Sequence, residues 1–573
     1  MALTIVSTQV PTGDAPICDV MLEPYIVIKE GDGPGTACHV PDEGCLESGA
    51  RFRLRSRWFR AMVHGGSAVC SVHPDREATI QCLLCLRAHA PAPLSFHCGP
   101  ECLKEHWRMH KDDYHLRQYQ NGGVENGYAS NGSSYRNSSS HEEWVEVGRS
   151  RCYVPTAEDV GCVLKFECSI ADSHRPYYQD MGGLCMGSTT ARVRPAPQPP
   201  VRAIIPLRHL AVPKLRHEGR FTVLTYNILA DLYATGDVYG TYCPAWALSW
   251  HYRRQNIIKE LACYRADIVC LQEVQSDHYE DHVRDAMQEL GYIGVFKKKT
   301  TEVYTGREMA IDGCATFYRR DRFALIKKYE VEFNKAAMST ANHFPEPQRN
   351  AALNRLSKDN VALIVVLESV APMAARQKQL ICVANTHIHA NPEHSDVKLW
   401  QVHTLLKGLE KIAASADIPI IVAGDFNSEP GSAAHTLMVT GSIDKTHPET
   451  AHDPAQFLQT LLPVQHKLSL RSSYSAVFAG NAKDLAVQQQ AMRMDPRTHE
   501  PLFTNLRRDY GGTLDYIFFT PTLLTPTALL ELPSEEEVVR GNSRDSGLPN
   551  ARYSSDHISL MAEFQLVIPF QLE

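Results

Sequence analysis

The sequence contains no long apolar run and no excess of basic residues, and each absence removes a class of function. No stretch of about 18 consecutive apolar residues occurs in the 573-residue chain, so we expect no membrane-spanning helix. The first residues, MALTIVSTQVPTGDAP, lack a basic segment followed by a sustained apolar one, so no secretory signal is predicted. The formal net charge of −7 argues against a globally basic nucleic-acid-binding protein, so any phosphate must be bound by local basic groups or cations.

Cysteine occurs 17 times, an odd number, in predicted strands as well as in loops. A scattered, odd set without a secretory signal does not predict a disulfide framework. It indicates a reducing compartment, and we expect the protein in the cytoplasm and the nucleus. In such a compartment a cluster of cysteines is more often a set of metal ligands than a set of disulfides.

Two stretches of biased composition divide the chain. Residues 121–140, NGGVENGYASNGSSYRNSSS, contain almost nothing apolar and predict a flexible linker. Residues 195–213 are rich in proline and predict an extended segment. Strand-like stretches at 40–54 and 154–166 look faintly alike, which leaves open a small β module split by the Cys/His cluster between them.

From Gly219 to the end, strand-like and helix-like patterns alternate, as in FTVLTYNIL (221–229), WHYRRQNIIKELACYR (250–265) and DIVCLQEV (267–274). This alternation favours an α/β fold. The chain is therefore predicted to have six segments. They are a β-rich segment over 1–65, a Cys/His module over 66–118, a disordered linker over 119–143, a second β-rich segment over 144–194, a Pro-rich linker over 195–218 and an α/β domain over 219–573.

Polar side chains recur at the edges of the predicted strands of the α/β domain. Each one alone would usually be a cap or a turn residue, but α/β sheets gather their strand ends into one crevice, where ligands bind. Eight acidic, amide and imidazole groups share this placement: Asn227, Glu273, His387, Asp425, Asn427, Asp515, Asp556 and His557. We therefore expect these groups to form one catalytic site.

The residue types in this set fit the cleavage of a phosphodiester. Carboxylates hold Mg²⁺, which prefers oxygen ligands and keeps several waters. The metal neutralises the phosphate and the charge that develops on it. A histidine supplies proton transfer near neutral pH when a carboxylate orients its other nitrogen, and asparagine amides position a water or a phosphate oxygen without adding charge.

The motifs TYNIL, LQEV, NTHI, GDFNS, LDYIFF and SSDH, in this order, resemble those of the endonuclease/exonuclease/phosphatase superfamily. Within it, AWALSWHYRRQNIIKEL, DGCATFYR and NPEHSDVKLWQ resemble the carbon catabolite repressor 4-type deadenylases, over residues 219–573. The resemblance implies a four-layer α/β sandwich of two packed mixed sheets flanked by helices. It also implies a Mg²⁺-dependent 3′→5′ exoribonuclease that shortens mRNA poly(A) tails and releases 5′-AMP, as the catalytic subunit of a deadenylase complex found in the cytoplasm, mRNA decay bodies and nucleus.

The resemblance also implies roles for the eight residues. Glu273 would hold one or two Mg²⁺ ions, with Asn227 beside it and Asp556 close to the metal.

Asp425 and Asn427 would orient the attacking water and the phosphate. Asp515 would orient His557, the candidate base and phosphate contact, and His387 would stabilise the phosphorane-like transition state. Both histidines could instead act electrostatically.

Three further residues match positions that sandwich the terminal adenine in the resembling enzymes: Pro392, Asn505 and Tyr510. Tyrosine replaces the phenylalanine of related animal proteins, which keeps a stacking surface worth about 1–3 kcal/mol. Hydrogen bonding at the base edge must add the discrimination, and asparagine suits it. The chain departs from the family pattern in a longer segment at 476–502 and in the absence of a Leu-rich repeat.

Residues 69–115 hold a dense Cys/His cluster with paired ligand spacings. Zinc takes four such ligands tetrahedrally, so eight in under fifty residues predict two structural zinc ions. FHCGPECLKEHWRMHK also resembles the MYND-type zinc finger, although His73 and His115 stand where cysteines are usual. The resemblance implies two sites, one of Cys70, His73, Cys98 and Cys102 and the other of Cys82, Cys85, His110 and His115, with His106 left as a surface helix residue.

MYND modules bind short proline-containing peptides, so we expect this one to bind a second, CAF1-like deadenylase subunit or another protein with a proline motif. Poly(A) RNA is the expected substrate, and no membrane contact is expected. Two other functions stay open. One is a phosphatase or phosphodiesterase acting on a small nucleotide or lipid, and the other is a non-catalytic adaptor that keeps a nuclease fold.

Overall fold

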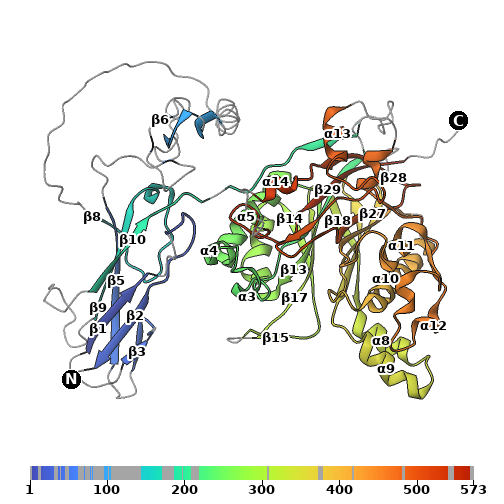
Figure 1. The fold of residues 1–573 in the computed structure, drawn as a ribbon, viewed down its shortest axis with the longest axis horizontal. Coiled ribbons are helices and arrows are strands. Elements are labelled where there is room, and N and C mark those ends of the chain that lie inside the picture. Colours follow the sequence, from blue (N-terminus) through green and yellow to red (C-terminus); the bar gives the residue numbers. More distant parts are fainter. Residues whose placement is uncertain are drawn as a thin grey trace. The chain divides into compact units, whose positions relative to one another are not determined.

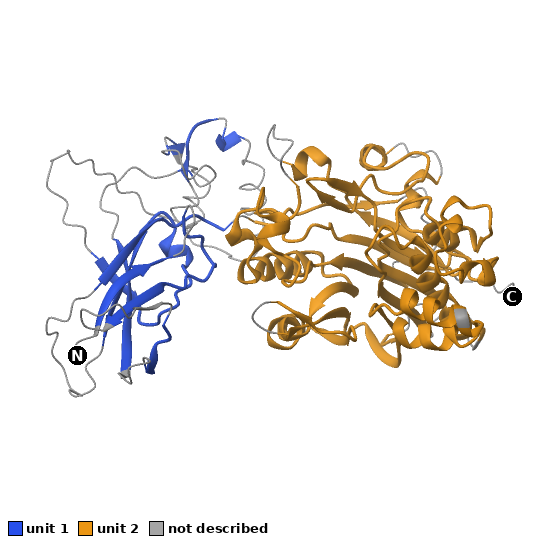
Figure 2. Cartoon of the chain, turned by 60° about the horizontal axis from the view of Figure 1, so that its bottom comes forward, with its two compact units in different colours: residues 1–197 blue, residues 198–573 orange. Residues whose placement is uncertain are grey.

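The computed structural model divides the chain into two compact units, Met1–Pro197 and Gln198–Glu573 (Figure 2). Each unit is described by itself. The structure describes residues 3–10, 15–30, 36–38, 40–45, 51–61, 70, 78, 80–81, 96–100, 102–104, 144–170, 186–196, 198–207, 219–305, 309–371, 378–415, 418–479, 484–539 and 547–567. The predicted linker over 119–143 lies outside these residues.

The first unit is built from two antiparallel sheets, of orders β1-β2-β3 and β10-β9-β5-β4, with β8 paired to β5 and a separate pair β6-β7. Strand β5 lies before the Cys/His segment and pairs with β8 and β9, which follow it. One sheet therefore joins the two sides of that segment. The strands are β1 (Leu3–Gln9), β2 (Tyr25–Glu30), β3 (Thr36–Cys38), β4 (Glu43–Cys45), β5 (Arg51–Ala61), β6 (Ile80–Gln81), β7 (Phe96–His97), β8 (Trp144–Gly148), β9 (Val163–Ile170) and β10 (Met186–Arg192).

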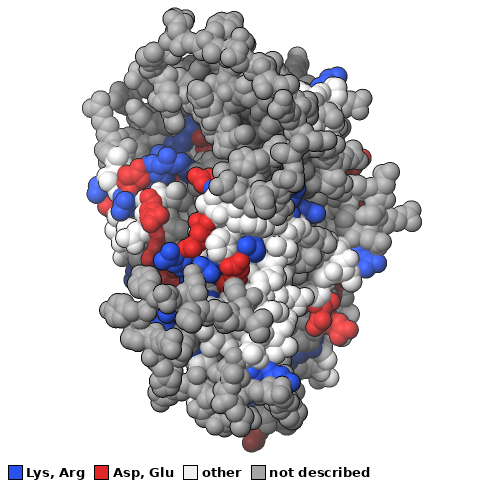
Figure 3. All heavy atoms as spheres, turned by 90° about the vertical axis from the view of Figure 1, so that its left-hand side faces the viewer, with Lys and Arg blue, Asp and Glu red and all other residues white. Residues whose placement is uncertain are grey.

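Strand β5 forms because its apolar residues alternate with arginines, so that one face of the strand is buried. Phe52, Leu54 and Trp58 point into the core, where Trp58 packs against Phe166 of β9 with ring centroids 5.0 Å apart. The arginines between them face outward. On the face that Figure 3 shows, the described basic and acidic side chains are interspersed and do not form a single basic stripe.

The second unit contains two mixed sheets packed face to face. The seven-stranded sheet has the order β11-β28-β29-β12-β13-β17-β14, and the six-stranded sheet has the order β18-β19-β20-β21-β27-β24. The strands of the first are β11 (Ile204–Pro206), β12 (Arg220–Asn227), β13 (Ile268–Gln275), β14 (Tyr292–Lys298), β17 (Asp312–Arg319), β28 (Leu524–Leu530) and β29 (Leu560–Leu566). Those of the second are β18 (Phe323–Glu332), β19 (Val361–Ser369), β20 (Leu380–His387), β21 (Ile420–Asp425), β24 (Arg471–Ser472) and β27 (Asp515–Phe519).

Helices cover the outer face of each sheet, which completes four layers (Figure 1). They are α3 (Gly236–Tyr239), α4 (Ala245–Leu248), α5 (Trp250–Tyr264), α6 (Ser276–His278), α7 (Arg284–Glu289), α8 (Phe333–Ala341), α9 (Glu346–Leu356), α10 (Ser395–Ser415), α11 (Ala433–Thr440), α12 (Leu458–Leu461), α13 (Leu485–Ala491) and α14 (Glu535–Val538). The predicted four-layer α/β sandwich is confirmed. Among the described residues, no helix has the length and apolar character needed to cross a membrane.

Strand β13 shows why the central strands are apolar on both faces. Ile268 and Cys270 belong to the core between the two sheets, whereas Val269 and Leu271 pack against the helical layer that includes α5. A strand that is buried on both faces reads as a continuous apolar run and not as an alternating one. Polar residues in such a strand are therefore confined to its ends or to special contacts.

The structure differs from the predicted Pro-rich linker over residues 198–207. Residues Ile204–Pro206 form strand β11, which pairs with β28 at the edge of the seven-stranded sheet. Just before it, Arg202 is buried, donates a hydrogen bond to the carbonyl oxygen of Ser559 at 2.8 Å and pairs with Glu260 at 3.3 Å. Proline is tolerated here because an edge strand leaves one side of its backbone without a ladder partner. Residues 208–218 lie outside the described residues.

Candidate active site

Three strand ends of the two sheets meet at one place. Strands β12 and β13 are parallel, as are β20 and β21, so Asn227, His387 and Asp425 all stand at C-terminal strand ends. The amide Nδ2 of Asn227 lies 3.0 Å from Oε1 of Glu273 on the same sheet and 3.0 Å from Oδ2 of Asp425 on the other sheet. Asn227 therefore joins the two sheets at the predicted site.

A bulge in β13 presents Glu273 to this cluster. The register of β13 with β17 shifts between Leu271 and Val274, and Glu273 adopts a left-handed backbone with φ of 54°. Bulges redirect side chains beside active sites, and left-handed backbone in a residue other than glycine is strained. Oε2 of Glu273 accepts a hydrogen bond from the backbone N–H of Ala230 at 3.0 Å, which fixes the carboxylate. Asn427 shares the strained conformation, with φ of 47°.

The SSDH segment, 554–557, closes the cluster from the chain's last strands. Nδ1 of His557 lies 2.7 Å from Oδ2 of Asp515, which also accepts a hydrogen bond from the hydroxyl of Thr504 at 2.7 Å. The hydroxyl of Ser555 donates to the carbonyl oxygen of Asn227 at 2.6 Å and accepts from the backbone N–H of His557 at 3.1 Å. Ser555 thus ties the segment to β12, a role that the sequence did not reveal.

The eight predicted residues therefore lie together in the structure. Asn227, His387, Asp425, Asp515, Asp556 and His557 are buried, whereas Glu273 and Asn427 are partly exposed. Nε2 of His387 lies 3.6 Å from Oδ2 of Asp425, and Nε2 of His557 lies 3.7 Å from the same oxygen. The two imidazoles approach one carboxylate, and the partly exposed residues mark where solvent reaches it.

Burial and neighbouring charges move the pKa values of the two histidines in opposite directions. Burial lowers the pKa of His387 well below its ordinary value, and the charges of Lys299 and His557 lower it further. Burial also lowers the pKa of His557, but the carboxylates of Asp515, Asp556 and Asp425 outweigh it and raise the pKa well above its ordinary value. Without a metal ion, His557 is therefore a cation and His387 is neutral.

Crowded carboxylates make the cluster suited to a divalent cation. Burial raises the pKa of Glu273 to about 7, with further contributions from Asp312 and Asp556, and burial raises that of Asp425 to about 6. One ligand atom each from Asp425, Asp515 and His557 lies within 4.8 Å of the others. This group is not the predicted metal-binding pair, Glu273 and Asp556. It does not displace that pair as the expected site, because Asp515 and His557 already bond each other. A cation would restore the ionised form of these carboxylates.

The predicted adenine-binding residues have three different surroundings. Asn505 is buried, donates from Nδ2 to Oδ2 of Asp556 at 3.1 Å, and has no hydrogen-bond partner for its buried Oδ1 among the described residues. Tyr510 is partly exposed and donates to Glu429 at 2.9 Å. Pro392 is exposed in the turn between β20 and α10. Only Asn505 hydrogen-bonds directly to a residue of the eight, and its open acceptor suits an exocyclic amine.

The structure adds an ion pair that sequence reasoning missed. Nζ of Lys299 lies 2.9 Å from Oδ2 of Asp312, and both side chains are buried. The hydroxyl of Tyr233 donates to Oδ1 of Asp312 at 3.2 Å. Asp312 is the first residue of the motif DGCATFYR, so the sequence contained a signal for this residue. Lys299 is one of three consecutive lysines, and nothing in the sequence distinguishes it from the other two.

Three of the predicted zinc ligands lie together in the first unit. One sulfur each from Cys70, Cys98 and Cys102 lies within 4.8 Å of the others, and Nδ1 of His97 lies 3.6 Å from Sγ of Cys102. Thiols at this spacing are a donor set that zinc prefers. The other predicted ligands, His73, Cys82, Cys85, His110 and His115, and the spare His106, lie outside the described residues.

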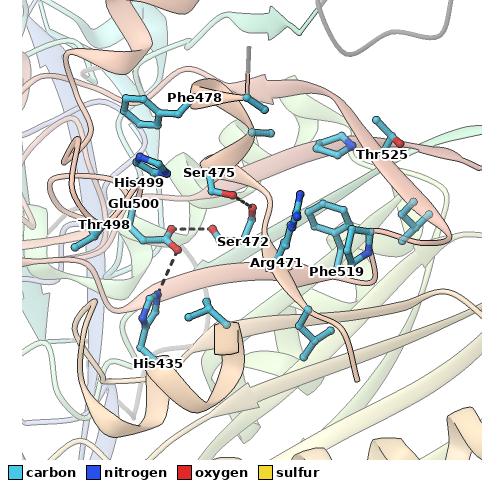
Figure 4. Close-up of a pocket in the computed structure, with 17 residues that line it drawn as sticks. His435, Arg471, Ser472, Ser475, Phe478, Thr498, His499, Glu500, Phe519 and Thr525 are labelled. Atoms are coloured by element: carbon cyan, nitrogen blue, oxygen red, sulfur yellow. Dashed lines mark hydrogen bonds and ion pairs between the residues drawn. The ribbon is translucent and has the colours of Figure 1, made fainter. Parts of the chain in front are cut away.

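A cavity of about 490 Å³ lies beside β24 and is separate from this chemistry, because none of the eight residues lines it (Figure 4). Its wall includes Phe478, His499 and Glu500 from the long segment 476–502. Buried Glu500 accepts a hydrogen bond from Ser472 at 2.7 Å and lies 3.3 Å from Nε2 of His435. The long segment therefore packs against the edge of the six-stranded sheet.

Comparison with known proteins gives consistent matches over this unit. The model of the Endonuclease/Exonuclease/phosphatase family matches residues 224–557, which include all eight residues. Carbon catabolite repressor protein 4 homolog 1 of Arabidopsis thaliana is 46% identical, over 98% of both chains. The CCR4-Not complex 3′-5′-exoribonuclease subunit Ccr4 of Mycosarcoma maydis is 34% identical, over 60% of this chain and 50% of its own. The mouse 2′,5′-phosphodiesterase 12 is 30% identical, over 77% of this chain and 67% of its own.

Proposed function

This chain belongs to the endonuclease/exonuclease/phosphatase family, in its carbon catabolite repressor 4-type branch, and we propose that it is a Mg²⁺-dependent 3′→5′ exoribonuclease that shortens mRNA poly(A) tails and releases 5′-AMP. The observation that carries the proposal is the hydrogen bonding of Asn227 to Glu273 and Asp425 across the two sheets, beside the His557–Asp515 pair. The relative from Mycosarcoma maydis, a 3′-5′-exoribonuclease subunit by name, supports the direction of cleavage.

Each polar residue has a distinct task in this proposal. Asp425 accepts a proton from the attacking water or orients it, because its Oδ2 faces both histidines. Protonated His557, whose Nδ1 is held by Asp515, donates from Nε2 to a phosphate oxygen that gains charge. Neutral His387, whose Nε2 lies 3.6 Å from Oδ2 of Asp425, receives or relays a proton. This division reverses the expectation that His557 is the base, because carboxylates surround it.

Glu273 and Asp556 would hold Mg²⁺, with Asn227 orienting the Glu273 carboxylate. When bound, the metal supplies positive charge that offsets the phosphate and lowers the barrier to attack on it. The raised pKa of Glu273 supports this assignment, because a carboxylate that resists ionisation alone gains most from a cation. Asp425 and His557 then stay free for water and phosphate, with Asp515 holding His557.

Adenine selection would depend on Asn505 and Tyr510. The buried Oδ1 of Asn505 can accept a hydrogen bond from the exocyclic amine of adenine, which uracil lacks. The ring of Tyr510 offers a stacking face, with the Arg507 guanidinium 5.7 Å from its centroid on one side. Pro392 is the third predicted contact and would approach the base from the exposed turn 391–393.

A second candidate function is the hydrolysis of 2′,5′-linked phosphodiesters, which the name of the mouse relative suggests. The same carboxylates and histidines serve either linkage, because the attacked group is a phosphodiester in both. Only the position of the ribose relative to the cluster differs. A 2′,5′-linked adenosine trimer distinguishes the two functions, because the proposed enzyme cleaves the 3′,5′-linked trimer faster.

In the first unit, we propose that Cys70, Cys98 and Cys102 hold a structural zinc ion with His73, and that Cys82, Cys85, His110 and His115 hold a second one. The clustering of the three described cysteines supports the first site. A MYND-type module of this kind would bind a second, CAF1-like deadenylase subunit. We propose that the protein acts in the cytoplasm, including mRNA decay bodies, and in the nucleus.

The test of the nuclease function is a time course on 5′-labelled RNA that ends in 20 adenosines, against the same RNA that ends in 20 uridines. Wild type and Glu273→Gln are compared with Mg²⁺ and with chelator. A descending ladder that needs both Glu273 and Mg²⁺, and that is slower on the uridine tail, supports the proposal. Equal cleavage of both tails would refute the adenine pocket, and no cleavage of either would refute the nuclease function.

A further inference from the structure

Lys299 is a buried cation beside the cluster with no role in the proposed chemistry. It follows β14 directly, and Asp312 opens the neighbouring strand β17, so their ion pair stands at the base of the β15–β16 hairpin, Val303–Tyr304 and Met309–Ala310 (Figure 1). The backbone N–H of Lys299 also donates to the carbonyl oxygen of Asp312 at 2.8 Å. Backbone and side chain therefore fix the position of the ammonium group.

This position is at the same sheet edge as the predicted catalytic groups. Strand β17 pairs with β13, and Asp312 stands opposite Gln275, two residues after Glu273. The ion pair of Lys299 and Asp312 therefore stands at the same end of β13 as Glu273.

The described residues around Lys299 hold its ammonium group in place but do not accept all of its protons. An ammonium group has three protons to donate. Among the described residues, this ammonium group forms an ion pair with Oδ2 of Asp312 at 2.9 Å and donates a hydrogen bond to the hydroxyl oxygen of Tyr233 at 3.4 Å. Lys398, the other buried lysine near the site, instead bonds the backbone carbonyl oxygen of Asn427. Within the described residues, the ammonium group of Lys299 therefore keeps a proton with which it can bind a further oxygen.

The proposed adenine contacts define the direction of the RNA strand. Asn505 and Tyr510 lie in the β25–β26 pair, Asn505–Arg507 and Tyr510–Gly512, where Asn505 touches Asp556. Lys299 comes from the opposite flank, beyond Glu273 on β13. If the terminal base lies at Asn505 and the scissile phosphate lies at the cluster, then the strand leaves on the side of Lys299.

We propose that Lys299 is a substrate-binding residue whose ammonium group, held by Asp312 and Tyr233, contacts the RNA phosphate one linkage 5′ of the scissile linkage. The inference rests on the proposed exoribonuclease function and adds to it the site that binds the strand upstream of the cut. A lysine is suited to this task because it acts as a compact point charge towards a phosphate. The counter-charge of Asp312 keeps the side chain in place when no RNA is bound.

The test removes the charge of Lys299 and the charge of its proposed RNA phosphate, each alone and then both together. Lys299→Met is compared with wild type on a short oligoadenylate and on the same oligoadenylate with a neutral methylphosphonate at the second linkage from the 3′ end. On the natural RNA, we expect kcat/KM of Lys299→Met to fall about 10- to 100-fold, as for the loss of one charge-assisted hydrogen bond. On the neutral-linkage RNA, we expect wild type and variant to agree within about threefold, because the partner charge is already gone.

Lys297→Met is the matched control. Lys297 lies on β14, two residues before Lys299, and also forms a partly buried ion pair, at 2.7 Å with Glu332. We expect it to cleave both RNAs like wild type. A third RNA, neutral only at the fourth linkage, should leave the full effect of Lys299→Met intact.

Two results would overturn the inference. One is an equal loss with Lys299→Met on the natural and the neutral-linkage RNA, which would make Lys299 a structural residue only. The other is no loss on either RNA. If Lys299→Met does not fold, Lys299→Gln replaces it, since its amide still donates to Asp312. If the wild-type protein cleaves no oligoadenylate at all, the proposed exoribonuclease function is refuted instead. Failure of the Lys299 inference and failure of the proposed function are therefore distinguishable.

Discussion

Nδ1 of His557 lies 2.7 Å from Oδ2 of Asp515, although 42 residues separate the two in the sequence. The pair is buried, and Thr504 donates a second hydrogen bond to the same carboxylate oxygen. The geometry makes Asp515 the group that fixes both the ring orientation and the charge of His557. Substitution of Asp515 therefore tests the site without removing any group that touches the phosphate.

We predict that Asp515→Asn lowers the single-turnover rate of poly(A) cleavage by about 10²–10⁴-fold, because an amide in place of the carboxylate no longer favours a protonated imidazole. The side chain keeps its shape, so RNA binding measured by fluorescence anisotropy should change little. Asp495→Asn, in an exposed turn, is the control and should leave the rate unchanged. A rate for Asp515→Asn within threefold of wild type would contradict the role of the pair.

A third carboxylate between Glu273 and Asp425 should make stability depend on pH. In Asn227→Asp, the new carboxyl would be buried between two others, so its pKa in the folded state would lie above its unfolded value. Stability is then lost as pH rises through the unfolded value of about 4 towards the raised folded value. We expect a loss of about 2–4 kcal/mol at pH 8 and much less at pH 5.

The measurement is chemical denaturation of Asn227→Asp and wild type in the presence of chelator at both pH values. Asn334→Asp, on α8, is the control and should lose little stability at either pH, because Asn334 bonds the exposed, neutral hydroxyl of Thr300. Addition of Mg²⁺ should return part of the loss at pH 8 if the carboxylates hold the ion. An equal loss at both pH values would mean that packing, and not charge, is responsible.

Binding of Mg²⁺ should lower the pKa of His557. Without a metal, the carboxylates of Asp515, Asp556 and Asp425 outweigh burial and hold the pKa of this imidazole well above its ordinary value. A bound cation offsets those charges, so we predict that saturating Mg²⁺ lowers the pKa. NMR titration of protein with ¹⁵N-labelled histidine follows the change, with His557→Gln to assign the signal. If the pKa of His557 stays the same at a Mg²⁺ concentration that supports cleavage, the metal binds elsewhere.

His389 should make the protein sensitive to acid. Burial, with contributions from His394, Lys358 and other cations, lowers the pKa of His389 to about 3. The unfolded chain takes up a proton near pH 6.5, whereas the folded protein does so only near 3, so stability falls as the pH drops through this window. We predict that His389→Asn gains stability relative to wild type between pH 7 and pH 4.5.

Thermal unfolding at several pH values checks this prediction. His343→Asn replaces an exposed histidine and should follow the wild-type pH dependence. A parallel pH dependence of His389→Asn and wild type would show that another group causes the acid sensitivity.

Zinc content tests the cysteine cluster of the first unit. Burial and the adjacent Cys70 and Cys98 raise the pKa of the Cys102 thiol to about 12, so the cluster gains from a cation that converts thiols to thiolates. We predict two zinc ions per chain by elemental analysis, and one in Cys102→Ser. Cys263→Ser, at an exposed cysteine of the second unit, should keep both. No zinc in the wild-type protein would refute both proposed sites.

The residue pattern by itself indicated the α/β character of the second unit and the eight polar residues of the site, whereas the four layers followed from the family resemblance. Apolar runs such as IVCLQEV reveal doubly buried strands because periodicity is local, and polar groups at their ends stand out against those runs. The ion pair of Lys299 and Asp312 could not be predicted in this way, because its members are neighbours only through the pairing of β14 with β17. Strand β11 was not predicted either, because the proline content of residues 195–213 favoured a linker despite the apolar residues around Ile205.

Only the tertiary structure decided the charges within the site. Asp556 and His557 are adjacent in the sequence, but the carboxylates of Asp425 and Asp515 reach His557 from β21 and β27 and make it a cation. His387 ends a strand in the same kind of motif and is neutral, because burial lowers its pKa and the charge of Lys299, from the other sheet, lowers it further. A sequence fixes which groups can titrate, whereas burial and through-space neighbours fix their pKa values, and both exist only once the sheets have packed.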